Sequence, residues 1–285
     1  MVQIGIQQLM LGKKLTSEKE AIKLLSTIKD NGFNGIELNG FMIRKTSLIV
    51  KWLTGLSGMP IKNSQSFDWE KIITISKMNV ISIHEDLAYL ENNLDEAIKQ
   101  AKKFNTKYFV ITGMYKFNYA NEEDLGKLIV KLNRLGRELE KQGIDLLYHN
   151  HSAEFQHVDY QTISLDYLIN GFNPKWVNFE FDSYWASCAG ASPLYWLNKL
   201  GDRVKLYHIC DRGPLKNKAS ITSIISKMGQ KEIGTGVMDL TPLVKKAIQN
   251  NVAAIILEQP NNIREKELLK SVRRSVNNIK KMIEE

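Results

Sequence analysis

The chain has 285 residues, of which 43% are hydrophobic and 25% charged, and 39 Lys and Arg against 31 Asp and Glu give a formal net charge of +8. This is the composition of an ordinary globular protein. Two cysteines, Cys188 and Cys210, exclude a disulfide framework of the kind found in small secreted proteins. The sequence shows no secretory leader pattern and no apolar run of about 20 residues, so we expect a cytoplasmic protein without a membrane partner.

The basic residues fall mostly in pairs inside amphipathic segments, interleaved with Glu and Asp: Lys13-Lys14, Lys102-Lys103, Lys245-Lys246, Arg273-Arg274 and Lys280-Lys281. No run reaches the five or six like charges that are typical of a nucleic-acid-binding tail. We therefore expect the positive charge on solvated helix faces and no nucleic-acid partner. A basic face could still steer a phosphorylated ligand.

Short runs rich in β-branched and aromatic residues alternate with stretches of helical periodicity. We predict eight strands: Gln3–Gln7, Gly35–Asn39, Val80–His84, Tyr108–Thr112, Ile144–His149, Trp176–Asp182, Val204–Ile209 and Ala254–Glu258. Between them, a capping box at Ser17–Glu20 begins a first helix that ends near Gly32. Further helices are predicted at Leu94–Phe104, Glu122–Gln142, Leu240–Asn250 and Ile263–Ile283. This alternation indicates βαβ units and a parallel sheet.

Eight strand–helix units fit a closed (β/α)₈ barrel, the α/β fold known as the TIM barrel, which needs about 250 residues. No G-x-G-x-x-G motif follows the first strand, which argues against an open dinucleotide-binding sheet. No linker rich in Pro, Gly or Ser is present, so we predict a single domain over residues 1–285. We interpret the irregular stretch Arg44–Ser66 as an elaborated loop over the functional face.

In such a barrel the functional residues lie at the C-terminal ends of the strands. Four of the five histidines occupy these positions: His84, His149, His151 and His208. Randomly scattered histidines would rarely do so, and the clustering therefore indicates a site. The carboxylates at the same strand ends are Glu37, Glu85, Asp182, Asp211 and Glu258.

The strongest candidate site consists of His149, Asp182, His208 and Glu258, which end four consecutive strands. Two imidazoles and two carboxylates suit one Mn²⁺, Zn²⁺, Co²⁺ or Fe²⁺ ion better than Ca²⁺. A nearby tyrosine, asparagine or carboxylate could orient these ligands. The alternative is that both histidines are hydrogen-bonded core residues and both carboxylates cap the helices that follow.

The strings LLYHNHSAEF, NFEFDSYWASCAGASP, GDRVKLYHICDRG, EIGTGVMDL and IILEQP resemble the xylose-isomerase-like TIM-barrel superfamily. Within it, the chain is most similar to the sugar phosphate isomerase/epimerase group, which includes inosose dehydratases and ketose 3-epimerases. The resemblance runs from the first strand to the eighth. It implies a divalent metal held at the ends of strands five to eight, where Asp182, His208 and Glu258 match directly.

Two positions depart from the pattern of that group. Ketose epimerases carry a glutamate at the strand-five ligand position, where this chain has His149, which argues against a symmetrical epimerisation by two glutamates. The group often has a lysine two residues after the strand-seven histidine, where this chain has Cys210. The substrate specificity of the group is therefore not carried over.

The chemistry that such a site serves is proton abstraction next to a carbonyl, with the metal stabilising the developing enediolate of a carbohydrate substrate. Return of the proton gives isomerisation or epimerisation, and loss of a β-hydroxyl gives dehydration. We expect Glu258 to be the base and Glu154 or His151 to be the opposite acid. For Glu154, a role as a salt-bridged loop residue is an equal alternative.

Four residues are candidate substrate contacts: Glu37, His84, Trp185 and Asp211. For Glu37 and His84 the alternative is a plain hydrogen bond at the barrel mouth, and for Trp185 it is ordinary packing. An inosose-dehydratase-like lyase is the first alternative function. A DNA-repair endonuclease of the same superfamily needs three zinc ions and more histidines than five, and a non-catalytic sugar binder has no use for a Lewis acid. A homo-oligomer is compatible with the sequence.

Overall fold

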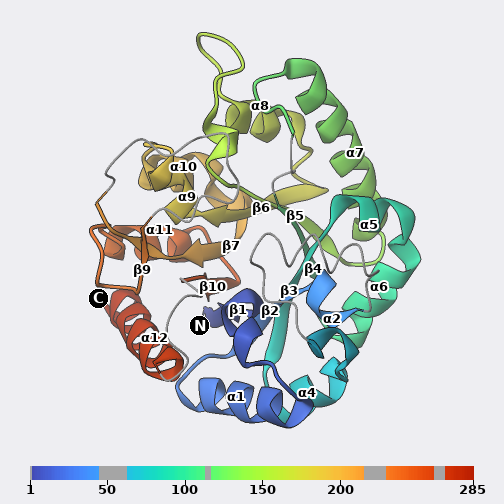
Figure 1. Ribbon diagram of the computed structural model, residues 1–285. Coiled ribbons are helices and arrows are strands. Elements are labelled where there is room, and N and C mark those ends of the chain that lie inside the picture. Colours follow the sequence, from blue (N-terminus) through green and yellow to red (C-terminus); the bar gives the residue numbers. More distant parts are fainter. Residues whose placement is uncertain (1, 45–62, 113–116, 215–228, 260–266) are drawn as a thin grey trace.

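The computed structural model describes residues 2–44, 63–112, 117–214, 229–259 and 267–285. Its centre is a closed barrel of eight parallel strands in the order β1-β10-β7-β6-β5-β4-β3-β2 (Figure 1). These strands are β1 (Gln3–Gln7), β2 (Gly35–Asn39), β3 (Asn79–Glu85), β4 (Tyr108–Thr112), β5 (Asp145–His149), β6 (Val177–Asp182), β7 (Val204–Ile209) and β10 (Ala254–Leu257). All eight predicted strands are therefore confirmed, with shifts of one residue at some ends.

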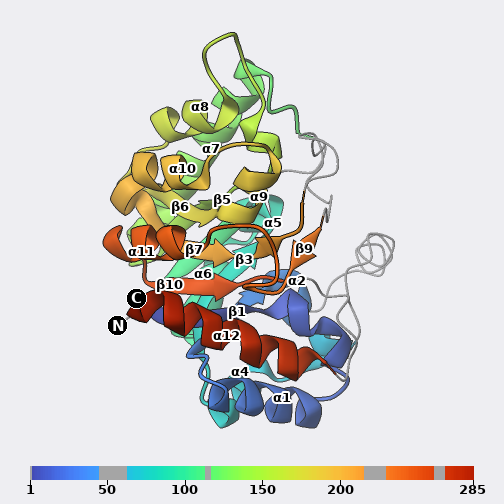
Figure 2. The ribbon, with the colours of Figure 1, turned by 90° about the vertical axis from the view of Figure 1, so that its left-hand side faces the viewer.

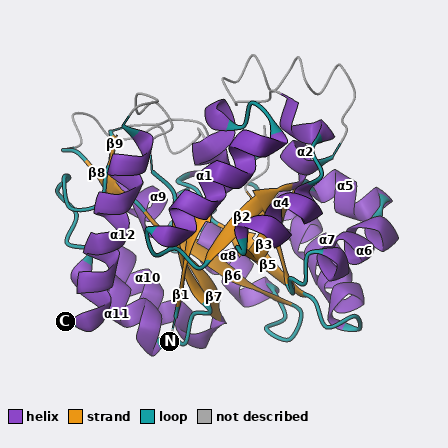
Figure 3. Ribbon diagram, turned by 90° about the horizontal axis from the view of Figure 1, so that it is seen from below, coloured by secondary structure: helices purple, strands orange, loops and turns teal. Residues whose placement is uncertain are grey.

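Helices surround the barrel in Figure 1, and the view from below in Figure 3 shows the same enclosure. The longer helices are α1 (Glu18–Asp30), α4 (Trp69–Ser76), α6 (Leu94–Lys103), α7 (Glu122–Glu140), α8 (Ser164–Gly171), α10 (Pro193–Leu200), α11 (Thr241–Gln249) and α12 (Leu268–Glu284). Shorter pieces are α2 (Gly40–Ile43), α5 (Leu87–Asn92), α9 (Ser183–Cys188) and the 3₁₀ turns η1 (Gln8–Lys14), η2 (Asn63–Ser66), η3 (Ala153–Phe155) and η4 (Gly201–Arg203). In the described part of the chain, no helix is long and apolar enough to cross a bilayer.

The five helices predicted from sequence are present as α1, α6, α7, α11 and α12. Ser17 caps α1 as expected, because its hydroxyl accepts a hydrogen bond from the N–H of Glu20 at 3.2 Å. Most of the predicted loop Arg44–Ser66, and the first residues of the predicted last helix, lie outside the described residues.

Alternation along the strands divides the apolar residues into two layers. Side chains such as Phe179 and Tyr207 point outward and join the large core between strands and helices. Leu147, Leu206 and Ile256 belong to a separate cluster inside the barrel. This inner cluster forms an apolar floor, and each of these three side chains lies two residues before a polar residue at the end of its strand.

A small antiparallel pair follows β7: β8 (Asp211–Arg212) with β9 (Gln230–Lys231). In Figure 2 this pair and α2 lie at the same end of the barrel. Because both follow the C-terminal ends of barrel strands, this end is the mouth at which a site is expected.

Candidate metal centre

The structure brings the four predicted ligands together at the barrel mouth. One ligand atom from each of His149, Asp182, His208 and Glu258 lies within 4.8 Å of the others. Asp182 Oδ2 is 3.9 Å from both His149 Nε2 and His208 Nδ1, and His208 Nδ1 is 3.0 Å from Glu258 Oε2. Two imidazole nitrogens and two carboxylate oxygens at these separations could hold a divalent ion.

Strand alternation explains the convergence. His149 lies two residues after Leu147, and His208 lies two residues after Leu206, so each imidazole shares the inner face with a leucine of the barrel floor. Asp182 ends β6 and has two roles. Its Oδ1 accepts a hydrogen bond from the N–H of Trp185 at 3.0 Å, which caps α9, while its Oδ2 faces the histidines. The capping role and the ligand role are thus compatible in one side chain.

Burial and charge oppose one another at these groups. Burial raises the pKa of Asp182 to about 7, although His208 opposes the rise. Burial would lower the pKa of His208, but the carboxylates of Glu180 and Glu37 outweigh it and raise that pKa well above its usual value. Burial also works against ionisation of Glu258, yet hydrogen bonding and charge interaction with His208 bring its pKa down to about 2. Four carboxylates facing histidines in a buried space form a strongly cation-attracting environment.

Sequence reasoning missed one member of this environment, Glu180. Its Oε2 lies 3.0 Å from His149 Nδ1, 2.7 Å from His84 Nε2 and 3.3 Å from His208 Nε2. Glu180 is two residues before Asp182 on β6 and therefore shares its inward face. That spacing was the signal available in the sequence. Together with His84, His149 and His208, Glu180 forms a second group whose ligand atoms lie within 4.8 Å.

The predicted substrate contacts Glu37 and His84 lie next to this deeper group. Glu37 is fully buried, and its Oε2 lies 2.8 Å from His208 Nε2 and 3.2 Å from His84 Nε2. Glu37 is therefore better placed to orient His208 than to contact a substrate. The side chain of His84 is 11% exposed, and its Nε2 is 2.7 Å from Glu180 Oε2. This contact is the hydrogen bond at the barrel mouth that was the alternative to substrate binding.

The candidate acids His151 and Glu154 lie on one turn after β5. The His151 ring packs beside those of His149 and Trp185, with centroids 5.0 and 4.9 Å away, and its Nδ1 is 3.3 Å from Thr112 Oγ1. Glu154 is fully buried behind this turn, where its oxygens accept hydrogen bonds from the Tyr148 hydroxyl (2.8 Å) and the His151 N–H (2.9 Å). Glu154 thus holds the turn that presents His151.

Asp211 is placed away from the four ligands of the candidate centre. Its two oxygens accept hydrogen bonds from the backbone N–H groups of Arg212, Gly234, Gly236 and Met238, at 2.8 to 3.1 Å. A carboxylate with these partners is better placed to order the loop around Gly234–Gly236 than to contact a substrate. The glycine at 236 is required here, because a Cβ would lie 2.2 Å from Asp211 Oδ1.

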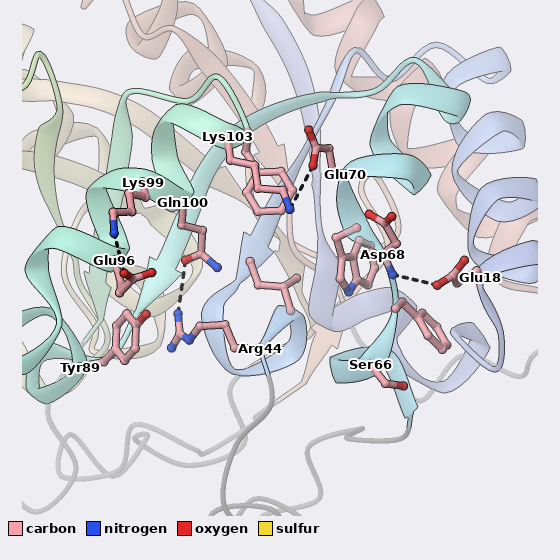
Figure 4. A pocket seen from close by; sticks show the side chains of 14 residues that line it. Glu18, Arg44, Ser66, Asp68, Glu70, Tyr89, Glu96, Lys99, Gln100 and Lys103 are labelled. Atoms are coloured by element: carbon pink, nitrogen blue, oxygen red, sulfur yellow. Dashed lines mark hydrogen bonds and ion pairs between the residues drawn. The ribbon is translucent and has the colours of Figure 1, made fainter.

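A pocket of about 520 Å³ lies between α4, α5 and α6, and it contains none of the predicted site residues (Figure 4). Charges of both signs line it, including Glu18, Arg44, Glu70 and Lys103. Figure 4 shows the Lys103–Glu70 and Arg44–Gln100 contacts inside it. Lys103 pairs with Glu70, and Arg44 pairs with Glu85 beside the pocket, so the lining offers no converging set of one sign. The barrel mouth remains the candidate site.

The family model for the xylose isomerase-like TIM barrel matches residues 25–282. The chain belongs to this family. The match spans both candidate acids and the whole cluster of histidines and carboxylates at the barrel mouth. The resemblance and the fold class predicted from the sequence are thereby confirmed.

Relatives within the family include inosose dehydratases. One, from Clostridium beijerinckii, is 30% identical over 145 residues, which are 49% of this chain and 48% of the relative. Another, from Bacillus velezensis, is 28% identical over 190 residues, 66% of this chain and 61% of the relative. The matched part of the chain thus spans about half to three fifths of the length of these curated relatives.

Two solved structures share the fold of this chain. A sugar phosphate isomerase/epimerase from Parabacteroides distasonis superposes with a TM-score of 0.73 at 20% identity, covering 96% of this chain and 92% of the other. The IolI protein, solved with a bound zinc atom, superposes with a TM-score of 0.68 at 13% identity, covering 99% of this chain and 96% of the other. At these identities the likeness shows the barrel fold alone.

Proposed function

We propose that the protein is a divalent-metal-dependent sugar isomerase or epimerase that abstracts a proton next to a carbonyl. The observation that carries this proposal is the convergence of His149, Asp182, His208 and Glu258 within 4.8 Å at the barrel mouth. The family membership, the sugar phosphate isomerase/epimerase neighbour and the zinc bound in a structural neighbour support it.

The residues present fit a divalent ion of the Mn²⁺, Zn²⁺, Co²⁺ or Fe²⁺ type, because the donor set mixes imidazole nitrogen with carboxylate oxygen. The four side chains of the upper group would hold it. Bound there, the ion would supply Lewis acidity toward the carbonyl and hydroxyl oxygens of a sugar. Oε1 of the buried Glu180 has no hydrogen-bond partner among the residues that the structure describes, and this carboxylate lies below the same position.

Two side chains of the site are placed to move protons. Glu258 is the most accessible of the four candidate ligands, with its side chain 26% exposed, and its low pKa means that it is ionised at neutral pH, the form in which it can act as a base. When Glu258 takes the proton from the carbon beside the carbonyl, the C–H electron pair forms the C=C bond of an enediolate. His151 then returns a proton from Nε2 while its Nδ1 gains one from the Thr112 hydroxyl, 3.3 Å away, which water reprotonates, and Glu258 gives its proton back to solvent.

The carbon that receives the proton decides the product. Protonation of the former carbonyl carbon gives the isomer, and protonation of the original carbon from the opposite face gives the epimer. Burial lowers the pKa of His151 well below its usual value, so the ring is neutral and donates a proton at one nitrogen only as it gains one at the other. Glu154, which holds the His151 backbone, would act on this step through position alone.

A second candidate function is dehydration of a keto-inositol or keto-sugar, and two observations favour it. The relatives from Clostridium beijerinckii and Bacillus velezensis are named inosose dehydratases, and the fifth strand presents His149 where a symmetrical two-glutamate epimerisation needs a carboxylate. In this reaction Glu258 again takes a proton next to the carbonyl. His151 would then protonate a β-hydroxyl, which leaves as water while the double bond forms.

The test is incubation of the Mn²⁺-loaded protein with a panel of ketoses and inososes in D₂O. Isomerase or epimerase activity predicts that the recovered sugar carries deuterium, detected by NMR, and has lost no water. Dehydration instead predicts the absorbance of a conjugated dione. Replacing Glu258 with Gln should reduce either rate by about 100-fold or more, as expected for loss of a general base.

The matched control is Glu138→Gln, which neutralises an exposed carboxylate on α7 and should leave the rate unchanged. Metal analysis of each variant separates loss of the base from loss of the ion. Full activity of Glu258→Gln would contradict the assignment of the base. Absence of both deuterium uptake and dione across the panel, with the ion bound, would contradict the proposed chemistry.

A further inference from the structure

Beneath the four proposed metal ligands lie two buried carboxylates with no place in the reaction described above. Glu180 Oε2 is 3.0 Å from Nδ1 of His149, and Glu37 Oε2 is 2.8 Å from Nε2 of His208. Both glutamates are fully buried in the barrel interior. An ionised carboxylate only accepts hydrogen bonds, so these contacts require the proton of each ring to be on the nitrogen that faces the barrel floor.

The remaining nitrogen of each ring faces the mouth. His149 Nε2 and His208 Nδ1 are the atoms 3.9 Å from Asp182 Oδ2. With the deep nitrogen protonated, His149 Nε2 presents a lone pair. His208 Nδ1 also lies 3.0 Å from Glu258 Oε2, so it presents a lone pair once an ion replaces the proton between these two groups. Metal-binding histidines generally donate their other N–H to a carboxylate or carbonyl, which fixes ring orientation and increases ligand basicity. Both rings have that partner here.

The strand pairing is irregular next to both glutamates. The β2–β3 register shifts between Ile36 and Glu37, and the β6–β7 register shifts between Phe179 and Glu180. Such irregularities re-aim side chains next to functional sites. The Ser82 hydroxyl further fixes Glu37 by donating a 2.6 Å hydrogen bond to Oε1.

We propose that Glu37 and Glu180 are positioning residues that select the tautomer and orientation of His208 and His149 for metal binding. His84 links them, because its Nε2 lies 3.2 Å from Glu37 Oε2 and 2.7 Å from Glu180 Oε2. This inference rests on the proposed function, since it needs an ion at the upper group. The deeper group is thereby assigned to hydrogen bonding, because an ion there would displace the protons that both rings donate to Glu180 and Glu37. In the upper group only His208 Nδ1 has such a contact, and its partner Glu258 is itself a proposed ligand.

The experiment measures binding of Co²⁺, a coloured probe, to the full chain by titration and visible absorption. Wild type should bind one ion per chain. Glu180→Gln and Glu37→Gln should still bind one ion but about 10- to 100-fold more weakly, because a neutral amide oxygen is a weaker acceptor for the ring N–H than a carboxylate and leaves the imidazole a weaker ligand. Their absorption bands should also shift, since the imidazole ligands are less basic and less firmly oriented.

Two further variants make the result specific. Ser82→Ala, which removes only the hydrogen bond to Glu37 Oε1, should weaken binding less than Glu37→Gln and remains informative if the latter does not fold. Glu85→Gln neutralises a buried carboxylate at the end of β3 that pairs with Arg44, and it should leave affinity and spectrum unchanged even if it lowers stability.

The outcomes separate the inference from the proposal beneath it. No binding of Co²⁺ by wild type would overturn the proposed function and this inference together. One ion bound by wild type, with affinity and spectrum unchanged in both glutamate variants, would overturn the inference alone. Two ions in wild type, one of them lost in Glu180→Gln, would show that the deeper group is itself a cation site and would also overturn it.

Discussion

At the scale of the residue, strand periodicity explains what could be predicted of the site and what could not. The four candidate ligands could be named because each ends a recognisable strand. Glu180 shares the inner face with Asp182, yet its depth in the barrel depends on the stagger between β5, β6 and β7, which single strands do not reveal. Glu37 was named, but the register shift beside it places it beneath the mouth.

Glu154 allows a test of burial at a single carboxyl. Burial raises its pKa from 4.5 to about 7, against the opposing effect of the Tyr148 hydroxyl. The folded protein then binds this proton more tightly than the unfolded chain. Glu154 therefore contributes most to stability below pH 4.5, and that contribution is lost as pH rises through 7, by about 3 kcal/mol in total.

Replacing Glu154 with Gln removes this titration. The stability deficit of the variant, measured by urea unfolding at pH 5 and pH 8, should therefore shrink as pH rises, because only wild type loses the contribution of Glu154 over that interval, whereas the other titrating groups are shared. A constant deficit at both pH values would show that Glu154 titrates as an ordinary carboxyl. Glu138→Gln serves as the reference for an exposed position.

At the scale of the element, the strands and long helices follow from sequence, and the short helices do not. Helices such as α7 carry several turns of apolar periodicity and a cap at Asn121. The six residues of α9 are too few to show a period, and all of them are buried. Packing against the barrel and the cap from Asp182 define that helix, and neither is visible in local sequence.

Two glycines within α7 give a matched pair. A Cβ at Gly126 would meet nothing within 4 Å, whereas a Cβ at Gly136 would lie 2.3 Å from the backbone oxygen of Trp176. Gly126→Ala should therefore raise the free energy of unfolding by about 0.5 to 1 kcal/mol, because alanine loses less conformational entropy in a helix. Gly136→Ala should lower it by about 1 kcal/mol or more, because backbone must move.

Urea denaturation of both variants beside wild type checks this pair. The same helix supplies the control, since each substitution adds one methyl group at one helical position. Equal effects of the two substitutions would mean that α7 does not pack against the start of β6 at Gly136.

At the scale of the whole molecule, the barrel separates stability from chemistry. Apolar side chains fill its floor, buried carboxylates and histidines lie above them, and the accessible part of Glu258 faces the mouth. The predicted basic pairs that the structure describes on α6 and α12, Lys102-Lys103 and Arg273-Arg274, are exposed on the outside. The net charge of +8 therefore does not describe the mouth, which is rich in carboxylates. The single domain over residues 1–285 stays a prediction.

This separation predicts how the molecule responds to metal removal. Because the two apolar layers close the barrel without help from an ion, treatment with EDTA should leave the far-UV circular dichroism spectrum unchanged. The melting temperature should nevertheless fall, since an ion at 100 times its Kd stabilises the folded state by about 2.7 kcal/mol, which corresponds to about 5 °C for a chain of this size. Re-addition of Mn²⁺ or Zn²⁺ should restore it.

Asp182→Asn tells ion binding apart from general salt effects. The asparagine Oδ1 can still accept the hydrogen bond from the Trp185 N–H that caps α9, so the fold is retained, while the negative charge facing His149 and His208 is lost. The melting temperature of this variant should respond much less than that of wild type to the same ion. If wild type and Asp182→Asn shift equally, the ion acts outside the barrel mouth; if EDTA unfolds wild type outright, the apolar layers do not hold the barrel closed on their own.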